Sequence, residues 1–230
     1  MQKAKILIIR FKNIIRNDEV SIFRGELIHA LGKEADILFH NHQDESFRYA
    51  YPLIQYKRIN KKASILCLNQ GTETIGKLFS ECNFNFNFKG QEVEMEIESI
   101  KATQFLIQPW DTMFSYRIRK WLPLNQENYK EFIALEGIVE KSTFLEKILI
   151  GNILSFSKGI NLFLEKEVLC KLIQFDEPKA VIYKGVKMMC FDAEFKSNVS
   201  LPDYIGLGKG VSLGFGMISR KLEKCNKEKI

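Results

Sequence analysis

The chain contains three histidines, and all of them lie within one stretch of fourteen residues: His29, His40 and His42. Imidazole titrates near neutral pH, so two such side chains can act as a general base and a general acid. The letters FHNH at 39–42 would also suit a metal site or an HNH-type nuclease. No carboxylates or cysteines complete a ligand set at convincing spacing, and the sequence therefore favours proton transfer without a metal.

Two groups of basic residues could bind a polyanion. Lys57, Arg58, Lys61 and Lys62 crowd a predicted hairpin, and alternation along a predicted strand over 115–121 places Arg117 and Arg119 on one face, next to Lys120. The net charge of +6 points the same way. Phosphate neutralisation by these groups would make binding fall steeply with salt. The alternative is a solvated, charged hairpin with no ligand.

The composition is that of an ordinary globular protein: 230 residues, 46% hydrophobic and 27% charged, enough for one large domain or two small ones. The five cysteines are scattered and never spaced C-x-x-C, which argues against a disulfide framework or a zinc site. The apolar run at the N-terminus is too short for a signal peptide, and no run reaches membrane length. We expect a cytoplasmic protein without a cofactor or a membrane partner.

The periodicity predicts an α+β fold of two modules, 1–112 and 113–230. In the first module, a helix over 18–33 buries Val20, Phe23, Leu27 and Leu31 and has Asp18 as its N-cap. A stripe of Phe84, Phe86 and Phe88 belongs to the core. The predicted order of strand, helix, strand, strand, helix, strand is the split βαβ arrangement, with elements over 4–11, 18–33, 51–59, 62–68, 71–82 and 83–102. The second module repeats this order loosely, with elements over 113–124, 125–160, 168–175, 179–185, 186–199 and 215–219.

Near the end of the chain, five glycines fall within eleven residues: Gly206, Gly208, Gly210, Gly214 and Gly216. Glycine permits positive φ and close approach of another chain, and successive amides in such a loop can hold an anion. The spacing fits neither the P-loop nor the dinucleotide-binding fingerprint. Two interpretations stay open: an anion-binding loop with Lys209 at its centre, or a turn packed beneath a neighbouring strand.

The stretch NVSLPDYIGLGKGVSLGFG at 198–216 resembles the C-terminal glycine-rich loop of the RAMP superfamily, and in particular its CRISPR-associated repeat-processing endoribonucleases. The resemblance extends to YPLIQYKRINKKASILCL at 51–68 and FRGELIHAL at 23–31, so that it runs over most of the chain. It implies two tandem ferredoxin-like (RRM-like, βαββαβ) modules followed by a glycine-rich loop over 204–216. It also implies that the ligand is CRISPR repeat RNA.

The resemblance further implies a metal-independent endoribonuclease that processes precursor transcripts to mature guide RNA. The 2′-hydroxyl of the RNA attacks the phosphate and leaves a 2′,3′-cyclic phosphate and a 5′-hydroxyl. His42 is the first catalytic candidate because it leads into the polar segment QDES, whereas His40 follows an apolar run and His29 lies on the first helix. Further catalytic candidates, which would orient the phosphate or the base, are Tyr49 and Tyr51.

Within the same resemblance, transition-state charge would be stabilised by Arg48, Lys57 and Arg58. The wider RNA-binding set adds Lys61, Lys62, Arg117, Arg119, Lys209 and the glycines 206, 208, 210, 214 and 216. The competing interpretation is a non-cleaving RNA-binding subunit of a CRISPR effector complex. The early histidines favour the enzyme, because a subunit that only grips RNA needs none. Effector-complex proteins and a second copy of the chain are further candidate partners.

Overall fold

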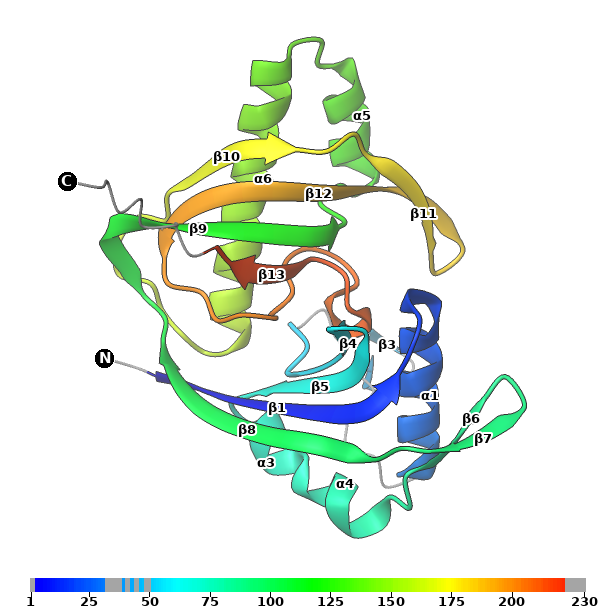
Figure 1. Ribbon diagram of the computed structural model, residues 1–230. Helices are drawn as coiled ribbons and strands as arrows, with labels where there is room; N and C mark the ends of the chain where they lie inside the picture. Colours follow the sequence, from blue (N-terminus) through cyan, green and yellow to red (C-terminus); the bar gives the residue numbers. More distant parts are fainter. Residues whose placement is uncertain (1–2, 32–38, 40–41, 44–45, 48–50, 222–230) are drawn as a thin grey trace, which may run out of the picture.

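The computed structural model describes residues 3–31, 39, 42–43, 46–47 and 51–221 (Figure 1). The chain has a mixed α/β fold with one main β-sheet in each half. Figure 1 shows the two sheets one above the other, with β13 at the edge of the upper sheet that faces the lower one.

The sheet of the first half has four antiparallel strands in the order β4-β5-β1-β8. These strands are β1 (Lys3–Ile14), β4 (Ile54–Ile59), β5 (Lys62–Leu68) and β8 (Ile97–Leu106). Between β1 and β4 the chain forms η1 (Asn17–Glu19), α1 (Val20–Ala30), β2 (His42–Gln43) and β3 (Ser46–Phe47). Between β5 and β8 it forms α3 (Gly71–Thr74), α4 (Gly76–Glu81), β6 (Asn85–Phe88) and β7 (Gln91–Glu94).

Helix α1 buries the predicted apolar stripe against the sheet. Val20, Phe23 and Leu27 are buried, and Leu31 follows at the helix end. The prediction of Asp18 as N-cap is wrong. Asp18 lies in η1, where its carboxylate pairs with the side chains of Arg16 and Lys89, both at 3.1 Å. The N-cap position of α1 is instead Glu19.

The predicted hairpin is confirmed as β4 and β5. Its turn residues, Asn60 and Lys61, have φ values of 50° and 68°, as a two-residue turn between twisted strands requires. The predicted helix over 71–82 is present but is divided at Ile75 into α3 and α4. The predicted phenylalanine stripe also belongs to the core, since Phe86 is fully buried and Phe84 and Phe88 pack against the same cluster.

The sheet of the second half has the order β10-β12-β9-β13, and β11 pairs with β12. Its elements are β9 (Pro109–Trp121), α5 (Gln126–Ala134), α6 (Ile138–Gly159), β10 (Cys170–Phe175), β11 (Lys179–Tyr183), β12 (Val186–Val199), η3 (Val211–Leu213) and β13 (Met217–Arg220). The chain passes from the first sheet to the second between β8 and β9, so the predicted module boundary at residue 112 falls inside β9.

The second half departs from the predicted βαββαβ order in three respects. Two α-helices, α5 and α6, lie between β9 and β10, and β11 is an additional strand. Between β12 and β13 the described chain forms the glycine-rich loop and the short η3 in place of an α-helix. Positive φ at Gly208, Gly210, Gly214 and Gly216 is incompatible with a helix there.

The two halves share one hydrophobic core. A cluster of buried side chains contains Ile6 and Leu66 of the first sheet together with Ile118 of β9 and Leu149 of α6. A second cluster lies between α1 and the other face of the first sheet. Apolar packing is therefore continuous from one sheet to the other. Within the described ranges, no helix combines the length and the apolar content that crossing a bilayer takes.

Candidate RNA-binding site

A cavity of about 310 Å³, here named the cationic pocket, lies where the two halves meet. Its basic side chains come from two strands of different sheets: Arg58 from β4, and Arg117, Arg119 and Lys120 from β9. The remaining lining residues are Asn17, Val20, Asp192, Leu213, Gly214 and Met217. Four cations around so small a cavity suit an anion with several oxygen atoms, such as a phosphate.

Strand β9 presents its arginines to the pocket by simple alternation. Tyr116 and Ile118 are fully buried in the shared core, whereas Arg117 and Arg119 point to the other face and line the pocket. The structure therefore brings together four residues of the predicted RNA-binding set: Arg58, Arg117, Arg119 and Gly214.

Two of the cations are held by contacts with the protein. The Nε of Arg58 donates a hydrogen bond to the carbonyl oxygen of Ile15 (2.6 Å), one residue after β1. The Nζ of Lys120 lies 5.8 Å from the centre of the Phe215 ring. Partial burial lowers the pKa of Lys120, and the neighbouring Arg58 lowers it further. A bound anion would relieve this repulsion.

The glycine-rich loop is tightly packed, mostly on itself, and Gly208 also meets Trp121 at the end of β9. A Cβ on Gly216 would lie 1.8 Å from the carbonyl oxygen of Leu207, and Gly216 itself has a φ of 62°. Added carbons on Gly206, Gly208 and Gly210 would also meet neighbouring atoms at 3.0 Å or less. Gly214 differs, since it lines the cationic pocket and a Cβ there would come no nearer than 3.5 Å to an atom of β4. Most of the Lys209 side chain is exposed to solvent. Its amine is partly desolvated by neighbouring atoms, which lowers its pKa.

Tyr51 connects the start of β4 to this loop. Its hydroxyl donates a hydrogen bond to the carbonyl oxygen of Gly206 (2.7 Å) and accepts one from Nε2 of Gln55 (3.0 Å). Its ring packs edge-on against Phe156 of α6, with 5.1 Å between centroids. Burial raises the pKa of Tyr51 above its usual value. These contacts assign the side chain a structural task, and its predicted role at the phosphate stays a prediction.

The predicted catalytic histidines are described only in part. His29 is exposed on α1. The backbone of His42 forms β2 and pairs with Phe47, but its side chain lies outside what the structure describes. His40, Arg48 and Tyr49 also lie outside the described residues. The catalytic roles of these residues therefore stay predictions.

The lysines of the β4–β5 hairpin fall into different environments. Lys57 is fully buried, and its Nζ has no hydrogen-bond partner among the described residues. Burial lowers the pKa of Lys57 to about 7. Lys61 is exposed at the turn, and the ammonium of Lys62 pairs with the carboxylate of Glu98. Lys61 is thus exposed, and no ion pair of its ammonium is seen among the residues that the structure describes.

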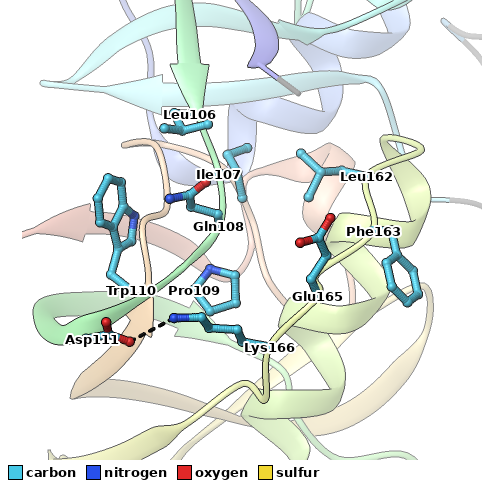
Figure 2. Close-up of a pocket in the computed structure, with 10 residues that line it drawn as sticks. All are labelled: Leu106, Ile107, Gln108, Pro109, Trp110, Asp111, Leu162, Phe163, Glu165 and Lys166. Atoms are coloured by element: carbon cyan, nitrogen blue, oxygen red, sulfur yellow. Dashed lines mark hydrogen bonds and ion pairs between the residues drawn. The ribbon is translucent and has the colours of Figure 1, made fainter. Parts of the chain in front are cut away.

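A larger hollow of about 670 Å³ has a different character (Figure 2). It lies between the β8–β9 connection and the segment after α6, and its aromatic side chains are Trp110 and Phe163. Lys166 is paired with Asp111 at 2.9 Å, and Glu165 adds a further carboxylate. This lining carries a net negative charge, so the cationic pocket is the better candidate for binding RNA.

Sequence reasoning missed Asn17 and Asp192 as lining residues. No motif marks either of them, because the pocket forms only when the two sheets meet. No group of three histidine, cysteine or carboxylate side chains in the described part of the chain is placed to hold a metal ion.

Two family models match almost the whole chain: the Cas6b N-terminal domain over residues 2–105 and the Cas6b C-terminal domain over residues 108–221. The chain belongs to the Cas6b family. The mixed α/β architecture agrees with a crystal structure of Cas6b at a TM-score of 0.86 and 25% identity, covering 96% of this chain and 100% of that one. A solved structure of a CRISPR RNA processing endoribonuclease Cas6b shares the fold, with a TM-score of 0.72, 23% identity and the same coverage.

One curated relative of this Cas6b chain has a closely similar sequence. MJ0978, an uncharacterized protein of Methanocaldococcus jannaschii, is 40% identical over 137 residues, which are 58% of this chain and 90% of that protein.

Proposed function

We propose that this Cas6b chain is an endoribonuclease that cleaves CRISPR repeat RNA within precursor transcripts. The observation that carries the proposal is the match to both Cas6b domains, which together span residues 2–105 and 108–221. A solved protein of the same fold is described as a CRISPR RNA processing endoribonuclease. The cationic pocket between the halves supports an RNA substrate, because it offers four basic side chains to a phosphate backbone.

The proposed reaction uses a nucleophile that the RNA itself provides. A base removes the proton of the 2′-hydroxyl, whose oxygen attacks the adjacent phosphorus. An acid protonates the departing 5′-oxygen. The products are a 2′,3′-cyclic phosphate and a 5′-hydroxyl, and no metal ion is needed. His42 is our first candidate for the proton transfers, with His40 and His29 as alternatives.

The pocket cations have an electrostatic part in this scheme. The phosphorane gains negative charge as the 2′-oxygen attacks, and preorganised cations stabilise that charge. Arg58, Arg117, Arg119 and Lys120 hold the RNA strand where the halves meet, so that it contacts β4 and β9 at once. Lys61 and Lys209 are exposed and can add further phosphate contacts to the RNA.

We interpret both halves as ferredoxin-like modules in tandem. In order of appearance, the four main strands of each half have the same spatial order, 2-3-1-4, and every neighbouring pair is antiparallel. Helix α1 separates the first main strand from the second in the first half, and α5 and α6 do so in the second half, as the split βαβ arrangement requires. In the second half the glycine-rich loop takes the place of the second helix, and Gly214 thereby reaches the cationic pocket.

The test is cleavage of end-labelled repeat RNA in the presence of EDTA. The proposal predicts cutting at one position within the repeat, with a 2′,3′-cyclic phosphate on the upstream fragment. His42→Ala is the matched variant, and it should stop cutting while RNA affinity stays within a few-fold. Normal rates in that variant would move the role to His40 or His29. Binding without any cutting by the unmodified protein would support the non-cleaving RNA-binding subunit instead.

A further inference from the structure

Strand β9 contains a β-bulge at the cationic pocket. Ile118 pairs with Ala193 of β12, and Trp121 pairs with Phe191. Two residues of β9, Arg119 and Lys120, therefore lie opposite the single residue Asp192, and Lys120 has a φ of 51°. This two-against-one count is what a bulge produces, and a bulge changes the direction of a side chain.

The bulge decides where Lys120 points. Regular alternation would place Lys120 on the opposite face from Arg119, the face on which Tyr116 and Ile118 enter the core. In the structure, Arg119 and Lys120 both line the cationic pocket, although they are adjacent in sequence. The extra residue thus adds a fourth cation to the pocket.

The side chain of Asp192 holds this bulge. Its Oδ1 accepts a hydrogen bond of 2.7 Å from the backbone N–H of Lys120. The carbonyl oxygen of Lys120 accepts a second hydrogen bond, of 2.9 Å, from the N–H of Gly216 in the glycine-rich loop. The backbone carbonyl of Asp192 accepts a third from the N–H of Asp176, also at 2.9 Å, which fixes Asp192 to the chain after β10.

A carboxylate is an unexpected lining residue for a pocket that would bind phosphate. By charge alone Asp192 repels the ligand, and its removal should strengthen binding. The hydrogen bond to Lys120 gives it a compensating task, because a bulge amide with no ladder partner needs an acceptor. The hydrogen bond therefore bears on Lys120, since Arg119 already faces the pocket by alternation. We propose that Asp192 is a positioning residue for RNA binding, which acts through the Lys120 amide to direct Lys120 into the cationic pocket beside Arg119.

This inference rests on the proposed function, since it takes repeat RNA as the ligand. Its test compares two substitutions that remove the same charge. Asp192→Asn keeps an oxygen acceptor for the amide, whereas Asp192→Ala removes it. The measurement is the dissociation constant for labelled repeat RNA by fluorescence anisotropy over a series of salt concentrations.

For Asp192→Asn we expect affinity equal to or higher than that of the unmodified protein, with an unchanged salt slope. For Asp192→Ala we expect affinity to fall about tenfold and the salt slope to fall by about 1, as for the loss of one phosphate contact. Asp176→Ala is the control for net charge: it removes an exposed carboxylate from the chain after β10 and should not weaken binding.

Equal or tighter binding by both Asp192 variants would overturn the inference, because Asp192 would then act by charge alone. A second arm separates positioning from general loss of structure. In a protein that already carries Arg119→Ala and Lys120→Ala, Asp192→Ala should no longer weaken binding, and persistent weakening would also overturn the inference. Cleavage is not needed for this test, so RNA binding without cutting would refute the proposed enzyme and leave the positioning role measurable. An unmodified protein that binds no RNA would contradict both.

Discussion

The hydroxyl of Tyr51 donates a hydrogen bond of 2.7 Å to the carbonyl oxygen of Gly206, across 155 positions of sequence. This contact joins the segment just before β4 to the start of the glycine-rich loop. Tyr51 also packs on Phe156 of the second half, so one side chain links elements of both halves. The position of the loop beside β4 depends in part on this residue.

Tyr51→Phe should therefore destabilise the protein. The Gly206 carbonyl lies in a buried residue and would lose its donor, at a cost of about 1–3 kcal/mol in the free energy of unfolding. Urea denaturation followed by circular dichroism measures the change. Tyr129→Phe is the control, because Tyr129 is exposed on α5. If cleavage fell by orders of magnitude while stability was unchanged, Tyr51 would have a catalytic role and the structural assignment would be wrong.

Lys57 predicts a characteristic dependence of stability on pH. Burial lowers its pKa to about 7 from a usual value of 10.5, so the unfolded chain binds more protons at this residue than the folded chain between these two values. The free energy of unfolding therefore rises as the pH rises from 7 to 10.5. Below pH 7 the folded protein carries the full penalty of a buried, charged ammonium. Lys57→Met should raise stability most near pH 6.5 and much less near pH 9.5.

Urea denaturation at these two pH values measures the difference. Lys61→Met, on the exposed turn of the same hairpin, should change stability little at either pH. A stabilisation by Lys57→Met that stays constant from pH 6.5 to 9.5 would show that Lys57 titrates normally. Because Lys57 is buried, it cannot contact RNA directly, and Lys57→Met should change RNA affinity no more than about twofold. The sequence-based prediction, in which Lys57 contacts RNA, would require a larger loss.

Arg119→Ala should weaken binding of repeat RNA about tenfold and reduce the dependence of log affinity on log salt by about 1. Arg119 lines the cationic pocket, where it would neutralise one phosphate. Lys166→Ala removes the same charge from the hollow of Figure 2, where Lys166 is paired with Asp111. That variant should bind RNA normally. Equal losses in the two variants would show that net charge, and not the pocket, governs binding.

Gly216→Ala should destabilise the chain by more than about 1 kcal/mol, since alanine is strained at positive φ and its Cβ would overlap the Leu207 carbonyl. Gly151→Ala is the matched control, for which we expect the opposite effect on stability. Gly151 lies inside α6 with no atom within 4 Å of an added Cβ, so the alanine should stabilise the helix by about 0.5–1 kcal/mol. Both changes are measured by urea denaturation. Tolerance of alanine at 216 would mean that the loop is not packed as described.

Local periodicity was sufficient to predict the elements that depend on neighbouring residues. The stripe of Val20, Phe23 and Leu27 has helical spacing, and the turn at Asn60 and Lys61 separates two β-rich runs. Features set by contacts between distant segments were not predictable. The β9 bulge depends on an acceptor, Asp192, that lies 72 positions after Lys120, and nothing in the letters RIRKW marks it.

The environments of Lys57 and Arg58 in the β4–β5 hairpin were not predictable from the sequence either. Lys57 and Arg58 are adjacent and equally basic in sequence, but the glycine-rich loop crosses the backbone at this point, with the Gly214 Cβ position 3.8 Å from the Lys57 Cα. One side chain is buried and the other lines the cationic pocket. Alternation along β4 turns the two side chains to opposite faces, but the face that is covered is set by a loop about 150 residues later in the sequence.

The central claim is that the RNA supplies its own nucleophile. It is tested most directly by a repeat RNA with a single 2′-deoxy nucleotide immediately upstream of the cut, assayed beside the all-ribose strand in EDTA. We predict that the deoxy strand binds with unchanged affinity and is not cut at that position, while the all-ribose strand yields a 2′,3′-cyclic phosphate. Cutting of the deoxy strand at the same phosphate would show that water is the nucleophile and would contradict the mechanism.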